Sequence, residues 1–544
     1  MKKDILDMLN KYYDAYKEDY MSMFGEESNN YLEIDPEISF FKVVYRRHTR
    51  FAIENIILND LTRTKLNYSE KIISKCNISR NADLLSNLYL TFELPNIYSG
   101  SYTNESYTSN YEFKWIENIG INICNYIKLN IDSNTIDSLT SDYINIWKEL
   151  ILSDDEKQIF NKNIGHIEEL YEPKNSPGQN GVYPNITKGN TLSLQSEKWN
   201  NHQFKVISKT SGDFEESKIF PSIIGKKIKV PLPFYFMKNH GLSLPLIALQ
   251  YSQVSLELEF NAFKDLYTIN DPKYTNPASN SLNKRIKPSS ESYHNMTNFA
   301  INYDYDIKAK IEGEFVYLDE AERKRFSLYD HEYLITQNKL VLEDGSLLES
   351  NKSNIDIKLT LNNPMKYLAF IAKRDDFKNV NIINNYTNWI YPNIPPYSIE
   401  YLNKDNYYDK PRNKDLFYNP SNSDHKTLFN TTYLRKNILS KAQLIFDGNT
   451  IVDKDIEYFE NQQKMQYFKK NSNDGIYIYS FSINPNEYQP SGSCNFDSIH
   501  KAILRVYQPD MNQYNYYHNS RIYVYGINYN ILVITNGSGN LKFS

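Results

Sequence analysis

Cysteine is scarce in this sequence, and the few that occur are far apart. Cys76, Cys124 and Cys494 are the only three in 544 residues. Such a set provides neither a disulfide framework nor a zinc site, and it fits a reducing compartment. No apolar run approaches the roughly 20 residues that a membrane-spanning helix needs. Because Asp4 and Asp7 interrupt the opening MKKDILDML, it does not resemble a secretory signal, and we expect a soluble intracellular product.

The sequence also lacks the short motifs of common catalytic and nucleotide-binding sites. It contains no GxxxxGK[ST] phosphate loop, no HExxH zinc helix and no GxSxG nucleophile elbow. Its nine histidines are dispersed without metal-ligand spacing. We therefore predict a protein that is not an enzyme, with no cofactor and with no catalytic or metal-binding residues.

An excess of positive charge is absent as well. Lys and Arg total 61 and Asp and Glu total 66, which gives a formal net charge of −5. A protein that mainly neutralises nucleic-acid phosphates is expected to be basic. The balance argues against bulk packaging of DNA or RNA, and we expect no direct contact with nucleic acid.

The features that are present indicate β structure. Apolar residues alternate with polar ones in three segments, at residues 88–94, 254–260 and 355–361. Asp-Gly pairs lie between apolar runs and predict tight hairpin turns, at residues 344–345, 447–448 and 474–475. Long helical patterns are scarce, so the sequence predicts an all-β protein built of sandwiches or barrels. Since 544 residues exceed one hydrophobic core, we expect two β domains.

A few short helices are predicted between the strands. Residues 143–152 are apolar on one side, and Ser153 with Glu156 forms a capping box for a second helix. Asp319 and Glu322 give the same start signal to a charged helix over residues 319–326, which we interpret as an exposed link between the domains. Residues 1–22 read as an amphipathic helix that packs on its own chain or docks on a partner or a membrane.

Several segments together resemble the major capsid proteins of nucleocytoplasmic large DNA viruses. The resemblance covers the chain from residue 36 to its end, in the family's order and rough spacing. Its segments are ISFFKVVYRRHTRF at 38–51, PLPFYF at 231–236, LPLIALQY at 244–251, YLDEAERKRF at 317–326, HEYLI at 331–335, YSFSI at 479–483 and QPSGSCNF at 489–496.

The resemblance implies a double jelly roll, which is two tandem eight-stranded antiparallel sandwiches with short connector helices and long loop insertions. The domains are then a helical extension (1–24), a first jelly roll (25–318), a connector helix (319–332) and a second jelly roll (333–544). Polar stretches are predicted as exposed insertions at about residues 171–212, 263–296 and 374–426.

The resemblance also implies a function in the virion. Three chains are expected to form a pseudo-hexagonal homotrimeric capsomer of the capsid, assembled in the cytoplasm of the host cell. Expected partners are other copies of the chain, minor capsid proteins and, through the amino-terminal extension, an inner viral membrane. Two alternatives remain open, a transient scaffold of immature virions and a β-sandwich protein that binds or cleaves glycans.

Specific roles are predicted for a few residues within the resembling segments. Arg46 and Arg47 form either an intrachain ion pair or a pair with another subunit or the inner surface. Cys494 is a small buried apolar residue at the start of a strand. The run from Gln489 to Gly492 is a tight turn that sets strand direction.

Overall fold

A computed structural model describes ten stretches of the chain, and its strands fall in one of two units. The described residues are 7–12, 41–43, 45–58, 61–95, 112–171, 223–270, 285–286, 304–389, 436–509 and 518–543. Residues 1–50 form one unit and residues 51–544 the other. Residues 7–12 are helical and exposed, and the rest of the predicted helix over residues 1–22 lies outside the described residues.

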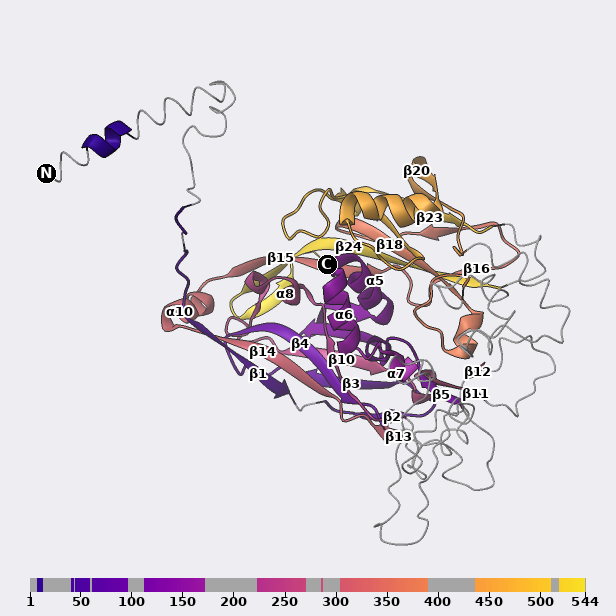
Figure 1. Ribbon diagram of the computed structural model, residues 1–544, viewed down its shortest axis with the longest axis horizontal. Helices are drawn as coiled ribbons and strands as arrows, with labels where there is room; N and C mark the ends of the chain where they lie inside the picture. Colours follow the sequence, from indigo (N-terminus) through magenta and orange to yellow (C-terminus); the bar gives the residue numbers. More distant parts are fainter. Residues whose placement is uncertain are drawn as a thin grey trace, which may run out of the picture. The chain divides into compact units, whose positions relative to one another are not determined.

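The first lobe is a sandwich of two antiparallel sheets (Figure 1). One sheet has the order β1-β14-β4-β8 and the other β3-β10-β6-β7. The eight strands are β1 (Phe51–Leu58), β3 (Ile72–Asn77), β4 (Leu84–Glu93), β6 (Cys124–Ile131), β7 (Asn134–Thr140), β8 (Lys227–Pro231), β10 (Val254–Phe260) and β14 (Lys310–Leu318).

The second lobe repeats this topology. Its sheets have the orders β15-β24-β18-β21 and β17-β23-β19-β20. In both lobes the first and last principal strands are neighbours, and the chain alternates between sheets as a jelly roll does. The strands are β15 (His331–Leu340), β17 (Asn354–Lys358), β18 (Pro364–Arg374), β19 (Lys441–Phe446), β20 (Asn449–Asp455), β21 (Ile476–Ser480), β23 (Ala502–Tyr507) and β24 (Ser520–Thr535).

Short strands extend these sheets or form small sheets beside them. Four join the large sheets: β9 (Leu244–Pro245), β16 (Ser346–Leu348), β22 (Cys494–Asn495) and β25 (Ser538–Leu541). The others pair among themselves: β2 (Lys65–Asn67) with β13 (Asp304–Asp306), and β11 (Tyr267–Asn270) with β5 (Glu112–Trp115) and β12 (Arg285–Ile286).

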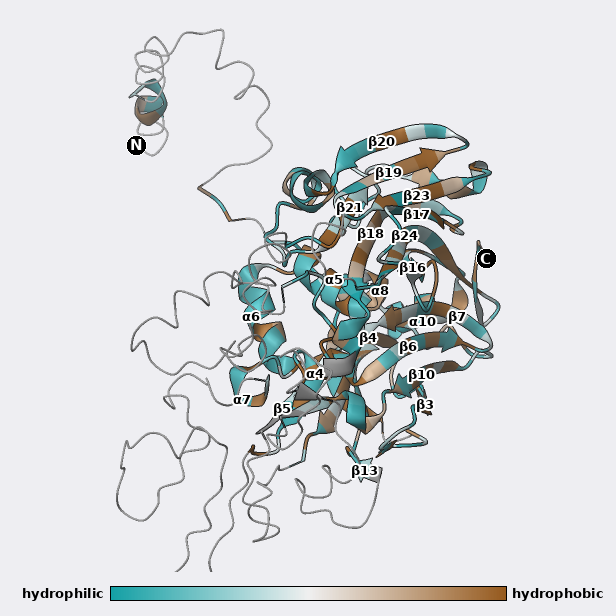
Figure 2. Cartoon of the chain, turned by 90° about the vertical axis from the view of Figure 1, so that its right-hand side faces the viewer, coloured by the Kyte–Doolittle hydropathy of each residue, from teal (hydrophilic) through white to brown (hydrophobic). Residues whose placement is uncertain are grey.

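Strand patterning predicted these sheets well because it follows burial. In β10 buried and partly buried residues alternate without exception, and apolar and polar segments alternate along strands of both lobes (Figure 2). The segment 88–94 lies in β4 apart from its last residue, whereas the strand predicted at 355–361 ends at Lys358.

Only one of the three Asp-Gly pairs makes a hairpin. Asp447 and Gly448 join β19 to β20, and both have positive φ, as a tight two-residue turn requires. The pair at 344–345 lies between β15 and β16, which each pair with β24 and not with each other, so the hairpin predicted there is wrong. The pair at 474–475 leads from a helical segment into β21, so that hairpin is wrong as well.

The predicted start signals of two helices are confirmed, whereas the helix predicted over residues 143–152 begins earlier, at Ser141. α5 (Ser141–Ile151) is followed by α6 (Asp154–Asn163), which has the complete capping box of Ser153 and Glu156. α10 (Glu320–Leu328) lies between β14 and β15, and the side chain of Asp319 accepts a hydrogen bond from the main-chain N–H of Glu322. None of its residues is buried.

The connection from β20 to β21 contains a helical segment that the sequence did not predict. It is formed by η7 (Tyr458–Gln462) and η8 (Lys464–Phe468), two stretches of π-helix. The equivalent connection of the first lobe, from β7 to β8, carries α5, α6 and α7 (Glu168–Tyr171). Both lobes therefore place helices between their fifth and sixth principal strands.

The remaining helices are single turns. They are α4 (Ile119–Asn122), α8 (Tyr235–Lys238), η3 (His240–Leu242), η4 (Phe263–Asp265), η6 (Asp376–Val380) and η9 (Phe496–Ser498).

The three predicted insertions lie largely outside the described residues. Their described parts are ordered, which corrects two of the boundaries. Phe263 and Tyr267 are 2% and 0% exposed and belong to the core, so the predicted insertion at 263 begins too early. Residues 376–380 form η6, so the insertion predicted from 374 also begins too early.

Candidate functional site: the interface between the two lobes

The large sheet of the second lobe is buried on both faces. In β18, Leu368, Phe370 and Ala372 belong to the core of the second lobe. The alternate residues Tyr367, Ala369 and Ile371 belong to a core that is shared with the first lobe. Successive strand residues point to opposite faces. This sheet is therefore the middle layer of a structure in which the first lobe covers its outer face.

A buried ion pair lies at one edge of this apolar contact. Lys373 at the end of β18 has its Nζ 2.6 Å from Oδ1 of Asp142, in the first turn of α5. The hydroxyl of Tyr386 donates to the same oxygen at 3.1 Å, and Nδ2 of Asn145 donates to the Tyr386 hydroxyl at 3.1 Å. Burial raises the pKa of Tyr386 well above its usual value. These partners compensate the buried charge of Asp142.

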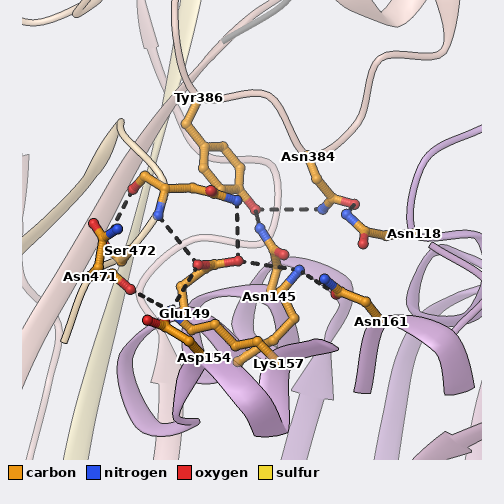
Figure 3. Close-up of polar contacts among 12 residues, drawn as sticks. Asn118, Asn145, Glu149, Asp154, Lys157, Asn161, Asn384, Tyr386, Asn471 and Ser472 are labelled. Atoms are coloured by element: carbon orange, nitrogen blue, oxygen red, sulfur yellow. Dashed lines mark hydrogen bonds and ion pairs between the residues drawn. The ribbon is translucent and has the colours of Figure 1, made fainter. Parts of the chain in front are cut away.

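A second carboxylate, that of Glu149 in α5, is bound from both lobes (Figure 3). Its Oε1 lies 3.2 Å from Nζ of Lys148, and its Oε2 lies 3.4 Å from Nζ of Lys157 in α6. From the second lobe, Asn473 donates its main-chain N–H at 3.3 Å and its side-chain Nδ2 at 3.1 Å. The α5–α6 pair is thereby fixed to the loop that precedes β21.

The third polar contact joins β7 to β15. The main-chain N and side-chain Nδ2 of Asn338 donate to Oδ1 of Asp137 at 3.2 and 3.1 Å. Burial raises the pKa of Asp137 to about 6, although the charge of Lys238 and the hydrogen bonds from Asn338 act in the opposite direction. Thr140, at the end of β7, also hydrogen-bonds the Tyr525 hydroxyl of β24 at 3.0 Å. Taken together, these contacts can hold the lobes in one fixed orientation.

Exposed apolar side chains gather on the outer face of β1, an edge strand of the first lobe. Phe51, Ile53 and Ile57 alternate along the strand and are 56%, 56% and 48% exposed. Phe51 and Ile53 are paired with Leu318 and Val316 of β14, which are only partly buried. We call these five residues the β1 patch. An exposed apolar edge is a surface for protein contact.

The structure tests some of the residue roles that the sequence predicted. Cys494 is the first residue of β22, as predicted, but it is partly buried rather than buried because it lies at the margin of the second core. Burial raises the pKa of its thiol. Gly492 has a φ of +122°, yet the residues with turn geometry are Pro485 and Asn486, so the tight turn lies before Gln489.

Arg46 and Arg47 are exposed, and neither forms an ion pair within the described residues. Both interpretations of this pair therefore stay predictions. Among all the residues that the structure describes, no three His, Cys, Asp or Glu side chains are grouped so that they could hold a metal ion. Among the described helices, none is sufficiently long and apolar for a membrane span.

Sequence reasoning missed the polar residues of the interface. Asp142 and Tyr386 are 244 residues apart, and Glu149 and Asn473 are 324 apart, so no local pattern connects them. The available signal was the row of polar residues on α5, a helix whose other face is strongly apolar. That row reads as a solvated face until the second lobe is placed against it.

Comparisons with known proteins agree with this architecture. Residues 39–306 match the family model "Major capsid protein N-terminus", and residues 322–540 match "Large eukaryotic DNA virus major capsid protein". The chain is 25% identical to the major capsid protein of Phaeocystis pouchetii virus, with 94% of this chain and 97% of that one covered.

Solved structures with the same fold include two viral capsid chains. One belongs to the PBCV-1 virus capsid, with a TM-score of 0.58, 21% identity, and 93% of this chain and 100% of that one covered. The other is the Faustovirus major capsid protein, with a TM-score of 0.58, 8% identity, and 92% and 93% covered. At these identities the likeness establishes the fold, the double jelly roll.

Proposed function

Because this chain belongs to the major capsid protein family of large eukaryotic DNA viruses, and is thus a capsid component of the virion, we propose that it tiles the shell as a homotrimer. Each chain supplies two lobes with the same strand order. Three chains therefore present six similar lobes around a threefold axis, which approximates a hexagonal tile. A closed ring of three also satisfies every head-to-tail contact and stops growth at that size.

The observation that carries this proposal is that β18 is buried on both of its faces, one against each lobe. A tile needs two lobes in one fixed orientation, and the shared core provides it. If the lobes were joined by α10 alone, their relative rotation would vary and the six lobes would not form a regular outline. The division into residues 25–318, 319–332 and 333–544 belongs to the same proposal, with the start of the second lobe moved to His331, where β15 begins.

We place one contact between the three chains at the β1 patch. Its apolar side chains are exposed in the single chain, and the partner we propose is a second copy of this chain. Obligate interfaces bury apolar side chains over roughly 2,000 Å² or more. Minor capsid proteins, assembly in the host cytoplasm and attachment of residues 1–24 to an inner membrane belong to the same proposal. Within it, the chain acts through shape and contact and turns over no substrate.

The test is the mass of the purified chain in solution at micromolar concentration. We expect three times the 64.1 kDa chain mass by light scattering. Ile53→Lys should weaken association by roughly tenfold to a hundredfold, because burying such a side chain contributes about 1.5–3 kcal/mol. The matched control is Ile159→Lys, at an exposed position of α6 away from the β1 patch, which should leave the trimer intact.

A folded wild-type chain that stays monomeric would overturn the trimer. A trimer that tolerates Ile53→Lys would instead exclude the β1 patch as the contact. Quantifying the chain in purified mature particles separates a shell protein from a transient scaffold, because a scaffold is lost on maturation.

A further inference from the structure

A lysine, an asparagine and a carboxylate meet where α5 packs on α6. Nζ of Lys148 lies 3.4 Å from Oδ1 of Asn161 and 3.2 Å from Oε1 of Glu149. Lys148 and Asn161 are 13 residues apart, on two consecutive helices. An amine beside a carboxamide, with a carboxylate in contact with the amine, is the set of groups that an amide-forming transfer requires.

The surroundings make the amine easier to deprotonate. The side chains of Lys148 and Glu149 are only 3% and 6% exposed. Burial lowers the pKa of Lys148, and the nearby charge of Lys157 acts in the same direction, although the carboxylates of Glu149 and Glu117 oppose both. Burial likewise lowers the pKa of His166 to about 4, so this neighbour of Lys148 is neutral. Trp147 and Phe160, which precede Lys148 and Asn161 in the chain, are buried and pack with ring centroids 5.9 Å apart.

We propose that Lys148 and Asn161 join in an intramolecular isopeptide bond, with Glu149 as the catalytic proton carrier. The neutral Nζ of Lys148 attacks Cγ of Asn161, and the Nζ–Cγ bond forms. Glu149 accepts a proton from Nζ and delivers it to Nδ2 of Asn161. The Cγ–Nδ2 bond then breaks and ammonia leaves. Glu149 is regenerated as a carboxylate, and no oxidant or other reactant is consumed.

The reaction depends on docking of the lobes, because Glu149 is oriented from the second lobe. Asn473 donates two hydrogen bonds to the Glu149 carboxylate, at 3.1 and 3.3 Å. Asn473 is therefore a positioning residue. The bond closes a loop between α5 and α6 after the chain has folded, and it locks the helix pair that contacts the second lobe.

A second lysine–asparagine pair in the same chain provides an internal comparison. Nζ of Lys339 contacts Oδ1 of Asn362, and Asp497 is the carboxylate whose charge acts on Lys339. Burial lowers the pKa of Lys339 as well. Asp497 is exposed, however, so water competes for the protons that it would have to carry. The proposal therefore predicts a covalent link at Lys148–Asn161 and none at Lys339–Asn362.

The experiment is mass spectrometry of the denatured full-length chain, followed by peptide mapping. We expect a mass lower than the sequence mass by one ammonia, and a branched peptide that joins Lys148 to Asn161. A folded wild-type chain without this loss, or with a link only at Lys339–Asn362, would overturn the proposal. This result is independent of whether the chain forms trimers.

Variants then assign the roles. Asn161→Ala and Glu149→Gln should each abolish the loss of ammonia, with circular dichroism used to show that the chain is folded. Asn473→Ala should slow the appearance of the link several-fold during refolding, a rate that a purely structural role would not change. Lys162→Gln and Asn163→Ala alter exposed residues of the same helix and should keep the link in full. A link that persists in Glu149→Gln would exclude the carboxylate as proton carrier.

Discussion

At the scale of single residues, Asp137 gives the fold an unusual dependence on pH. The folded chain raises the pKa of this carboxyl from 3.8 to about 6, mainly through burial. The folded state therefore binds the proton more tightly than the unfolded state. At low pH the protonated Asp137 stabilises the folded state. This stabilisation is lost as the pH rises from about 4 to about 6, because the folded state must then hold a buried charge.

Asp137→Asn should remove this dependence. The amide oxygen can still accept the hydrogen bonds from Asn338 but carries no charge. We expect the variant to be more stable than the wild type near pH 7 by on the order of 3 kcal/mol, and to lose this advantage near pH 4. Urea unfolding at both pH values measures it, with exposed Asp330→Asn as the control. An equal difference at both pH values would show that ionisation of Asp137 is not the cause.

At the scale of elements, two glycines of Asp-Gly pairs have similar backbones and different surroundings. Gly448 and Gly475 have φ values of +88° and +82°. A Cβ on Gly448 would meet no atom within 4 Å, whereas one on Gly475 would lie 2.4 Å from the carbonyl oxygen of Tyr386. A side chain would thus strain the backbone at both positions, but only at Gly475 would it also clash with a residue of the lobe interface.

Alanine at each position should separate these effects. Gly448→Ala is expected to cost about 1 kcal/mol of stability, from the left-handed backbone alone. Gly475→Ala should cost at least about 2 kcal/mol more, because the backbone of Tyr386, whose hydroxyl binds Asp142, must shift. Chemical unfolding of both variants under the same conditions compares them. Similar losses for the two would mean that the Tyr386 contact tolerates displacement.

The same elements show which parts of the fold the sequence could predict. The capping box of Ser153 and Glu156 was predictable because both partners lie within one turn. Alternation predicted strands such as β10, because burial of one face follows a period of two. The Asp-Gly pairs predicted where the chain turns, but not which strands pair on either side of the turn. That pairing is set by contacts between residues far apart in the sequence. β15 and β16 therefore flank such a pair without pairing.

The interface was beyond prediction from local patterns for the same physical reason. Tyr367 and Leu368 are both apolar, and nothing local says which of them faces a second lobe. Besides the polar row on α5, the near-continuous apolar run of β18 was a sign of the interface, since a strand buried on both faces has this pattern. The polar partners of Asp142 and Glu149 required the lobes to be placed first. Chain length and the charged helix at 319–326 predicted two linked β domains, and the resemblance to a known family supplied their double jelly-roll topology.

At the scale of the whole molecule, the shared core makes the second lobe dependent on the first. The outer face of its large sheet carries apolar residues that the first lobe covers, namely Tyr367, Ala369, Ile371, Ile476, Ile478, Tyr525 and Ile527. Each buried side chain of this kind contributes about 1.5–3 kcal/mol when it is fully removed from water. Without the first lobe this face would be a large exposed apolar patch, which promotes aggregation.

Residues 331–544 expressed alone should therefore aggregate or bind a hydrophobic dye, whereas coexpression with residues 1–330 should recover a soluble one-to-one complex. A control keeps the chain whole during folding and cuts it afterwards, at a protease site placed in the exposed α10. The two fragments should then elute together in size-exclusion chromatography, because the shared core and the Asp142–Lys373 pair hold them together after the peptide chain in α10 is cut. A second lobe that is soluble, monomeric and natively folded by itself would show that the shared core is dispensable, and the fixed orientation that tiling requires would need another cause.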